Sequence, residues 1–92
     1  MKKTEECFIV KITYNNPPHA HIGDNNPVFY ISGEDTWCES HNIIIARQFT
    51  SVKNAKSSIN TRKRYGRLKD CKCEIIRASF TVEELDVVEP NA

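Results

Sequence analysis

The segment SVKNAKSSINTRKRYGRLKDCKCEIIRASF, residues 51–80, decides the fold class because it changes from a helical to an alternating pattern. Ser51 is a favourable N-cap, so a helix is expected to begin there. Three apolar residues follow at helical spacing and would face a sheet: Val52, Ala55 and Ile59. Gly66 is a typical C-terminal stop, which predicts a helix that ends at Tyr65.

The residues after this helix predict a strand. In residues 71–80, Cys73, Ile75 and Arg77 alternate with their neighbours, as expected for a strand with two different faces. Cys73 is therefore expected to pack as a small apolar side chain rather than to bind a ligand.

Two further strands are expected before the helix. Residues 7–14, CFIVKITY, alternate in the manner of a half-buried strand, and residues 28–32, VFYIS, form the second. The connection between them is rich in Asn, Pro and Gly and long for a hairpin, which predicts a mobile or functional loop.

In two further segments the residue pattern is less regular. A turn is expected near Asn42 to Ile44, followed by an edge strand over Ala46 to Phe49. Beyond residue 80, Thr81 and Glu84 have capping-box spacing, so residues 81–92 form either one helical turn or a last short strand. The order is ββ(β)αβ, which predicts a single α+β domain over residues 1–92, a small antiparallel sheet with one helix packed on one face.

Length and composition place the chain among ordinary globular domains. It has 92 residues, of which 39% are hydrophobic and 27% charged. No apolar run approaches the roughly 20 residues that cross a bilayer, and Glu5, Glu6 and Lys11 interrupt what would be the core of a signal peptide. We therefore expect an unprocessed cytoplasmic protein without membrane contact, whose four cysteines are reduced.

The net charge of +1 hides a strong segregation along the chain. Residues 1–49 have four basic and six acidic groups, residues 50–77 nine basic and two acidic, and residues 78–92 four acidic and no basic groups. A basic centre between acidic flanks indicates a directed surface field and a partner of opposite charge.

The expected helix concentrates this positive charge. Four of its cations project within a sector of roughly 100°, next to the apolar stripe, and the charge continues into the following loop. The candidate partner-binding residues are Lys53, Lys56, Lys63, Arg64, Tyr65, Arg67 and Lys69. They suit an acidic protein surface or, through counterion release and stacking on Tyr65, a nucleic acid. The alternative is a solvated helix face whose cations complement the dipole.

Cysteines and histidines suggest a metal site only weakly. Cys38 and His41, with Cys71 and Cys73, would supply the four ligands of a tetrahedral zinc site. His19 and His21 offer another pair, but their Pro- and Gly-containing context favours exposed loop histidines. Because Cys-x-x-Cys spacing is absent, ordinary cysteines, no metal and no cofactor are expected.

A catalytic role is not favoured either. Cys38 with His41 could form a nucleophile and base pair, yet neither has flanking residues that would position a substrate. A phosphate-cradling Gly loop is also missing. We expect a protein that is not an enzyme.

Trp37, the only tryptophan, has two alternative roles. A lone Trp is more often a core anchor, which is the favoured interpretation here. If it is exposed, it marks an interface.

The packing residues, taken together, resemble those of small phage- and prophage-encoded α+β accessory proteins. The resemblance covers residues 7–78, and these positions carry it: Trp37, Ala46, Phe49, Ser51, Ala55, Ile59 and the strand residues CEII. It implies a non-enzymatic protein that binds a host or phage macromolecule, and some such proteins inhibit host defence. The basic helix differs from the acidic surface of inhibitors that mimic DNA.

The sequence thus predicts a small binding protein that occludes a surface of a macromolecular partner through its basic helix and the loop after it. The competing hypothesis is nucleic-acid binding by the same residues. An edge strand could pair two copies into a dimer, although nothing in the sequence specifies that state.

Overall fold

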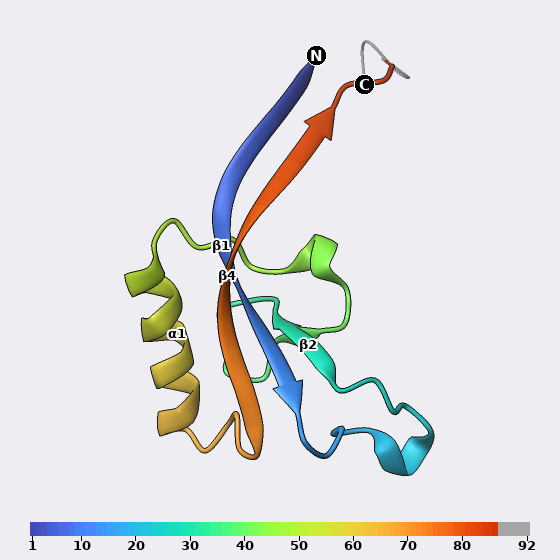
Figure 1. Cartoon of the computed structure of the whole chain (residues 1–92), viewed down its shortest axis with the longest axis vertical. Helices are drawn as coiled ribbons and strands as arrows, with labels where there is room; N and C mark the ends of the chain where they lie inside the picture. The colour runs from blue at the N-terminus through green and yellow to red at the C-terminus, as the bar shows by residue number, and fades with distance from the viewer. Residues whose placement is uncertain (87–92) are drawn as a thin grey trace.

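The computed structural model describes residues 1–86, which form a four-stranded antiparallel sheet with one α-helix (Figure 1). The chain therefore has the expected α+β class. Its elements in chain order are β1 (Lys2–Tyr14), the 3₁₀ turn η1 (Ala20–Ile22), β2 (Val28–Ile31), β3 (Glu39–Ser40), the 3₁₀ turn η2 (Ile43–Ile45), α1 (Val52–Arg64) and β4 (Cys71–Glu83). Within residues 1–86, the helices are too short and too polar to cross a bilayer.

The strand order is β3-β2-β1-β4, so β1 lies inside the sheet and β4 is an edge. β1 and β4 pair without a break from Lys2 opposite Glu83 to Tyr14 opposite Cys71. β2 pairs only with the last part of β1, where Lys11 lies opposite Tyr30. Both β1 and β4 are therefore longer than the sequence pattern indicated.

The main core lies between the sheet and α1. It contains these buried residues: Val10, Ile12, Phe29, Ile31, Phe49, Ala55, Ile59 and Leu68. Cys73 and Ile75 of β4 pack against it, which confirms the alternation expected for this strand. Burial of such apolar side chains is the main source of stability in a domain of this size.

The other face of the sheet is also covered in its middle. Cys7 and Ile9 of β1 form a second buried cluster with Ala46, which caps η2. Because both faces of β1 are buried there, Ile9 and Val10, adjacent in sequence, are each 0% exposed.

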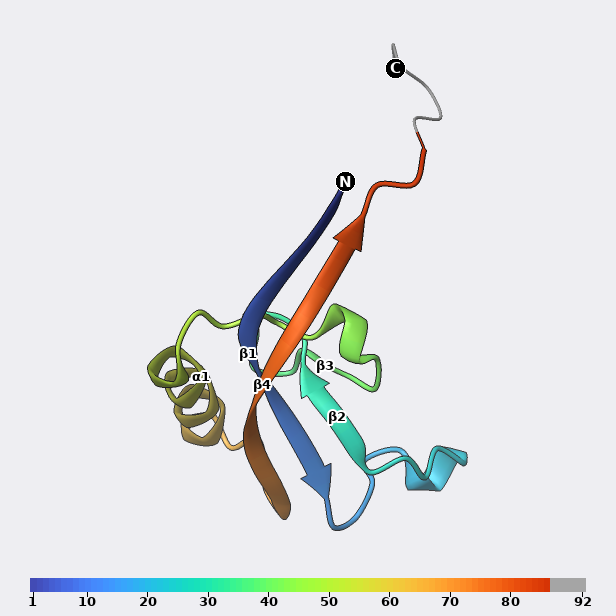
Figure 2. The same ribbon diagram turned by 45° about the horizontal axis from the view of Figure 1, so that its top comes forward.

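Beyond this body, β1 and β4 continue as a two-stranded ribbon (Figures 1 and 2). We call this ribbon, residues 2–7 paired with residues 78–83, the β-arm. The radius of gyration is 15.9 Å, whereas a compact domain of this length has about 12 Å. The β-arm makes the molecule elongated.

The helix begins after Ser51 as expected and ends at Arg64, one residue before the predicted end, with Tyr65 as its C-cap. The Ser51 side chain accepts a hydrogen bond from the Asn54 amide at 3.1 Å, and Gly66 follows the helix with φ of 79°. The expectation that Val52 faces the sheet is wrong, since it is 41% exposed. Val52 is the first helical residue and lies at the border of the buried stripe, whose third member is Arg62.

The expected edge strand over residues 46–49 is also wrong, because the third strand is β3. Residues 46–49 instead run beside the sheet. The Arg47 amide donates to the Ile31 carbonyl at 2.8 Å, and Phe49 exchanges two backbone hydrogen bonds with Phe8. The turn before them is confirmed, since the Asn42 side chain accepts a hydrogen bond from the Ile44 amide at 3.0 Å.

The capping-box alternative after residue 80 is wrong. Thr81 lies in β4, with its hydroxyl 2.9 Å from that of Thr4, so the strand alternative holds up to Glu83. Cross-strand pairing with β1 satisfies the backbone there, which leaves no helix to cap. Residues 87–92 lie outside the described part of the chain.

Candidate functional site

The outer face of α1 carries the predicted basic residues. Each of the seven candidate residues is exposed: Lys53, Lys56, Lys63, Arg64, Tyr65, Arg67 and Lys69. The stripe of α1 that adjoins this basic sector is buried and consists of Ala55, Ile59 and Arg62. The burial of that stripe orients the cations of the helix away from the sheet.

The loop after α1 holds Arg67 and Lys69 outward through a strained backbone. Gly66, Leu68 and Asp70 have φ values of 79°, 59° and 52°, and a left-handed conformation costs a non-glycine residue about 1–2 kcal/mol. Burial of the Leu68 side chain, which is 7% exposed, offsets part of this cost. The residues on either side of Leu68 consequently face solvent.

The carboxylate of Asp70 fixes the other end of this loop. It accepts hydrogen bonds from the side-chain amides of Asn15 at 2.8 Å and Asn16 at 2.7 Å. These bonds hold the pKa of Asp70 below its usual value, so it is ionised at neutral pH. They also tie the start of the long β1–β2 connection to the basic loop.

Arg62 belongs to the helix but not to its basic surface. Its side chain is 1% exposed, and its guanidinium donates to the carbonyl oxygens of Gly33 at 2.6 Å and Asp35 at 2.9 Å, and to Ser58. Burial, and then the charge of Arg47, lowers the pKa of Arg62. Arg62 therefore attaches the loop before β3 to the C-terminal half of α1.

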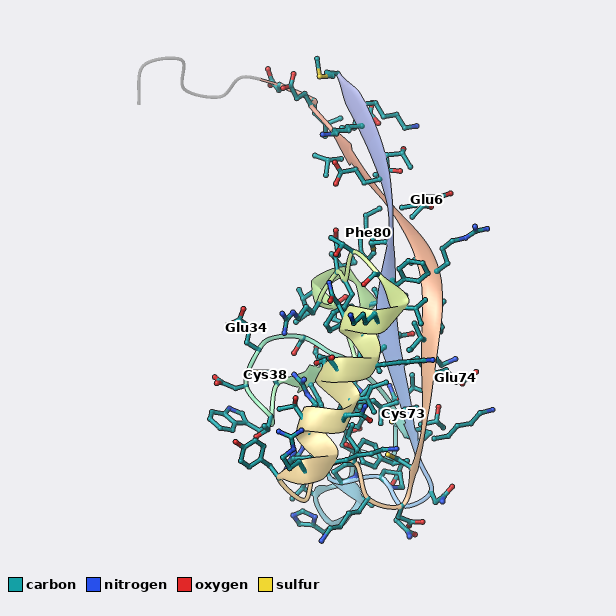
Figure 3. The ribbon with its side chains drawn as sticks, turned by 90° about the vertical axis from the view of Figure 1, so that its left-hand side faces the viewer. Glu6, Glu34, Cys38, Cys73, Glu74 and Phe80 are labelled. Atoms are coloured by element: carbon teal, nitrogen blue, oxygen red, sulfur yellow. The ribbon has the colours of Figure 1, made fainter. Side chains whose placement is uncertain are left out.

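This attachment brings the loop that contains Trp37 to the C-terminal half of α1. Trp37 lies two residues after Asp35, whose carbonyl oxygen accepts a hydrogen bond from Arg62. Two residues after Trp37, the carboxylate of Glu39 accepts hydrogen bonds from Arg67 at 3.3 Å and from the hydroxyl of Tyr14. Figure 3 shows the same loop, marked by Glu34 and Cys38, beside the helix. The core-anchor interpretation of Trp37 is wrong, since its side chain is 66% exposed.

Two exposed aromatic rings thus accompany the cations at this end of the helix, because Tyr65 is 68% exposed. We call this group the basic-aromatic surface: Trp37, Lys63, Arg64, Tyr65, Arg67 and Lys69. Lys53 and Lys56 extend its charge along α1. Sequence reasoning favoured a buried Trp37 and missed the burial of Arg62, although Arg62 follows Ile59 by three positions and so continues the buried stripe.

The proposed zinc ligands do not form one group. Within residues 1–86, no three His, Cys, Asp or Glu side chains come together in a way that could hold a metal ion. The sulfur atoms of Cys71 and Cys73 are 3.9 Å apart. Burial, and then the neighbouring Cys73, raises the pKa of Cys71 to about 11, so its thiol stays protonated at neutral pH.

His41 has a structural role instead. Nδ1 lies 2.7 Å from the Val28 carbonyl and Nε2 lies 2.9 Å from Asp24, so the doubly protonated ring donates to both acceptors. These two bonds raise the pKa of His41, and His41 lowers the pKa of Asp24. Because both nitrogens are engaged, His41 is not placed to accept a proton from Cys38. His19 and His21 are exposed, as expected for the loop.

We expect the interaction of His41 with Asp24 to make the stability of the fold depend on pH. Because the pKa of His41 is raised in the folded state, the protonated ring stabilises the fold. This stabilisation is complete below about pH 6.5, the pKa in the unfolded chain, and is lost as the pH rises through the pKa of the folded state. The melting temperature of the wild type should therefore fall more between pH 6 and about 8 than that of His41→Gln. His21→Gln, which changes an exposed histidine, is the control. A wild-type slope that His41→Gln leaves unchanged would contradict the assignment.

No protein-family model matches the chain, and comparison with curated proteins and with solved structures found no similar sequence or fold.

Proposed function

We propose that the protein is a non-enzymatic binding module that docks the basic-aromatic surface onto an acidic surface of another protein. The exposure of Trp37 and Tyr65 beside Arg64 and Arg67 carries this proposal. Trp, Tyr and Arg are the residue types that dominate binding energy at protein interfaces. Solvation of the helix cations alone does not account for the exposed Tyr65 after the helix or for the exposed Trp37 on the neighbouring loop.

The proposal extends to how the module acts. The resemblance to phage- and prophage-encoded accessory proteins implies a host or phage macromolecule as partner, and we propose that the module covers a functional surface of a host protein and so inhibits it. The surrounding Lys residues would speed the encounter with an acidic partner.

A second candidate function is binding of single-stranded nucleic acid. Cations beside exposed aromatic rings can follow a phosphate backbone while bases stack on the rings. A titration with single-stranded DNA or RNA oligonucleotides tests this, because the only tryptophan lies in the surface and its fluorescence reports stacking. Quenching that weakens steeply with salt would support the nucleic-acid function, and unchanged fluorescence at low salt would exclude it.

The protein-partner function predicts a charge-specific loss of binding. Lys63→Glu combined with Arg64→Glu should reduce recovery of the partner at least about tenfold, because two attractive contacts become repulsive. The measurement is quantitative mass spectrometry of proteins cross-linked to the chain in producing cells. The matched control is Lys2→Glu combined with Lys3→Glu, which makes the same charge change on the β-arm. Equal recovery with all three chains would refute the basic-aromatic surface as the interface.

A further inference from the structure

One face of the β-arm carries apolar side chains on β4, with Lys3 and Glu5 beside them on β1. Ala78 and Phe80 pack beside the Cys7–Ile9 cluster on the side opposite α1, and Val82 follows on the same face with 72% exposure. A groove of about 400 Å³ lies along it, with Phe80, Val82 and Gln48 in its wall. A two-stranded ribbon alone is marginally stable in water, so this arm would gain stability from further strands.

The two edges of the β-arm differ in character. The β1 edge carries four charges among residues 2–6, and its Lys3 and Glu5 already pair at 3.0 Å. Such charge is typical of an edge that is protected against pairing. The β4 edge over residues 77–83 has one charge at each end and five uncharged residues between them, with no proline. Its pairing with β1 continues without a bulge, so no extra residue interrupts the edge at which a further strand could pair.

We propose that two copies of the chain pair through their β4 edges, antiparallel and centred on Phe80, to form a continuous sheet across both β-arms. In this register Arg77 lies opposite Glu83 of the second copy, and Ala78 lies opposite Val82 of the second copy. Ser79 faces Thr81 of the second copy, and the two Phe80 rings meet on the apolar face. Cross-strand pairs of these kinds stabilise antiparallel sheets.

Charge complementarity selects this register. A two-fold axis perpendicular to the sheet requires that a strand pair with its own copy about a central residue. Centring on Arg77 would place like charges opposite each other, and centring on Ser79 would place Ile75 opposite Glu83. Centring on Thr81 would place Ala78 opposite Glu84. Only the Phe80 register pairs both charges and matches polarity at all seven positions of residues 77–83.

The side chains that would form the ion pairs are accessible. Arg77 and Glu83 are exposed, and within residues 1–86 neither has an ion-pair partner within 4.0 Å. They lie on the face of the sheet that carries α1 but beyond the helix, on the opposite side from Phe80. The interface would be small and its affinity modest, because it joins only seven residues of each strand. The proposal is independent of the proposed function.

Sedimentation velocity of the full chain, with any tag at the C-terminus, tests the proposal between about 10 μM and about 500 μM. The wild type should shift from monomer to dimer over this range. Arg77→Glu and Glu83→Arg should each raise the dissociation constant about tenfold or more, because each homodimer would contain two like-charge pairs. An equimolar mixture of the two variants should restore association, since the carboxylates of one variant then lie opposite the guanidinium groups of the other at both ends of the interface.

The control is Lys63→Glu combined with Arg64→Glu, which changes two charges at the C-terminal end of α1, outside the β-arm, and should leave the dimer intact. A wild type that stays monomeric at the highest concentration would overturn the proposal without any variant. It would also be overturned if the mixture of variants stayed monomeric while both were folded by circular dichroism, or if the α1 control abolished association.

Discussion

Replacing Arg62 with alanine is expected to lower the free energy of unfolding by about 3 kcal/mol. The change removes the donors of two carbonyl oxygens, on Gly33 and Asp35, and opens a cavity beside α1. A buried acceptor without a partner costs about 1–3 kcal/mol, and the lost packing adds to this. A domain of 92 residues has about 5–14 kcal/mol of stability, so the loss is a large share.

The geometry of Arg62 also predicts that lysine cannot replace it. Nη2 of the guanidinium donates to the loop before β3, and Nη1 donates to Ser58 one helical turn away. Lysine has a single ammonium group and cannot span both sets of acceptors, so Arg62→Lys should remain destabilised by at least about 1.5 kcal/mol. Urea denaturation followed by far-UV circular dichroism measures both variants. Lys63→Ala, the adjacent exposed residue, should change stability by less than about 0.5 kcal/mol. If Arg62→Ala behaved like Lys63→Ala, Arg62 would not attach the loop to the helix.

The sequence predicted those features of the fold that depend only on the residues within one helix or strand. The Ser51 cap, the Gly66 stop and the alternation around Cys73 each depend on local chemistry, and all three are confirmed. The misplaced third strand is different. Residues 46–49 alternate between apolar ends and a polar middle that a strand would also tolerate, but after η2 they run beside the sheet, and only tertiary contacts with Ile31 and Phe8 specify this path.

The same distinction between local and tertiary contacts applies to the candidate site. Exposure of the helix cations follows from helical spacing, which the sequence contains. The position of Trp37 follows from a contact between Arg62 and a loop 27 residues earlier in the chain, and no local pattern encodes such a contact. An arginine at a buried helical position was the available signal, since a buried guanidinium must find acceptors from another element.

If the proposed dimer forms, it changes what the basic-aromatic surface can do. Two copies joined at their β-arms would present two such surfaces on one rigid body. A partner with repeated or paired acidic surfaces would then be bound bivalently, with an avidity above that of one copy. Comparing partner binding by the wild type and by Arg77→Glu at equal chain concentration separates this gain from the affinity of one surface.

The largest functional effect is expected from the aromatic rings. Trp37→Ala combined with Tyr65→Ala should weaken partner binding by about 100-fold or more, because central Trp and Tyr residues each contribute about 2 kcal/mol or more at interfaces. The two side chains are 66% and 68% exposed, so the free energy of unfolding should change little. Binding is measured by titrating the recovered partner against each variant, and stability by urea denaturation.

The matched control for this prediction is Ile22→Ala combined with Ile44→Ala. These side chains are 71% and 75% exposed and lie in η1 and η2, outside the basic-aromatic surface. Loss of binding in the aromatic variant with retention in the isoleucine variant would show that specific rings, and not general apolar adhesion, hold the partner. Equal loss in both variants would refute the specific surface. Retention in both would show that the cations act without Trp37 and Tyr65, which is the behaviour of a nonspecific electrostatic contact.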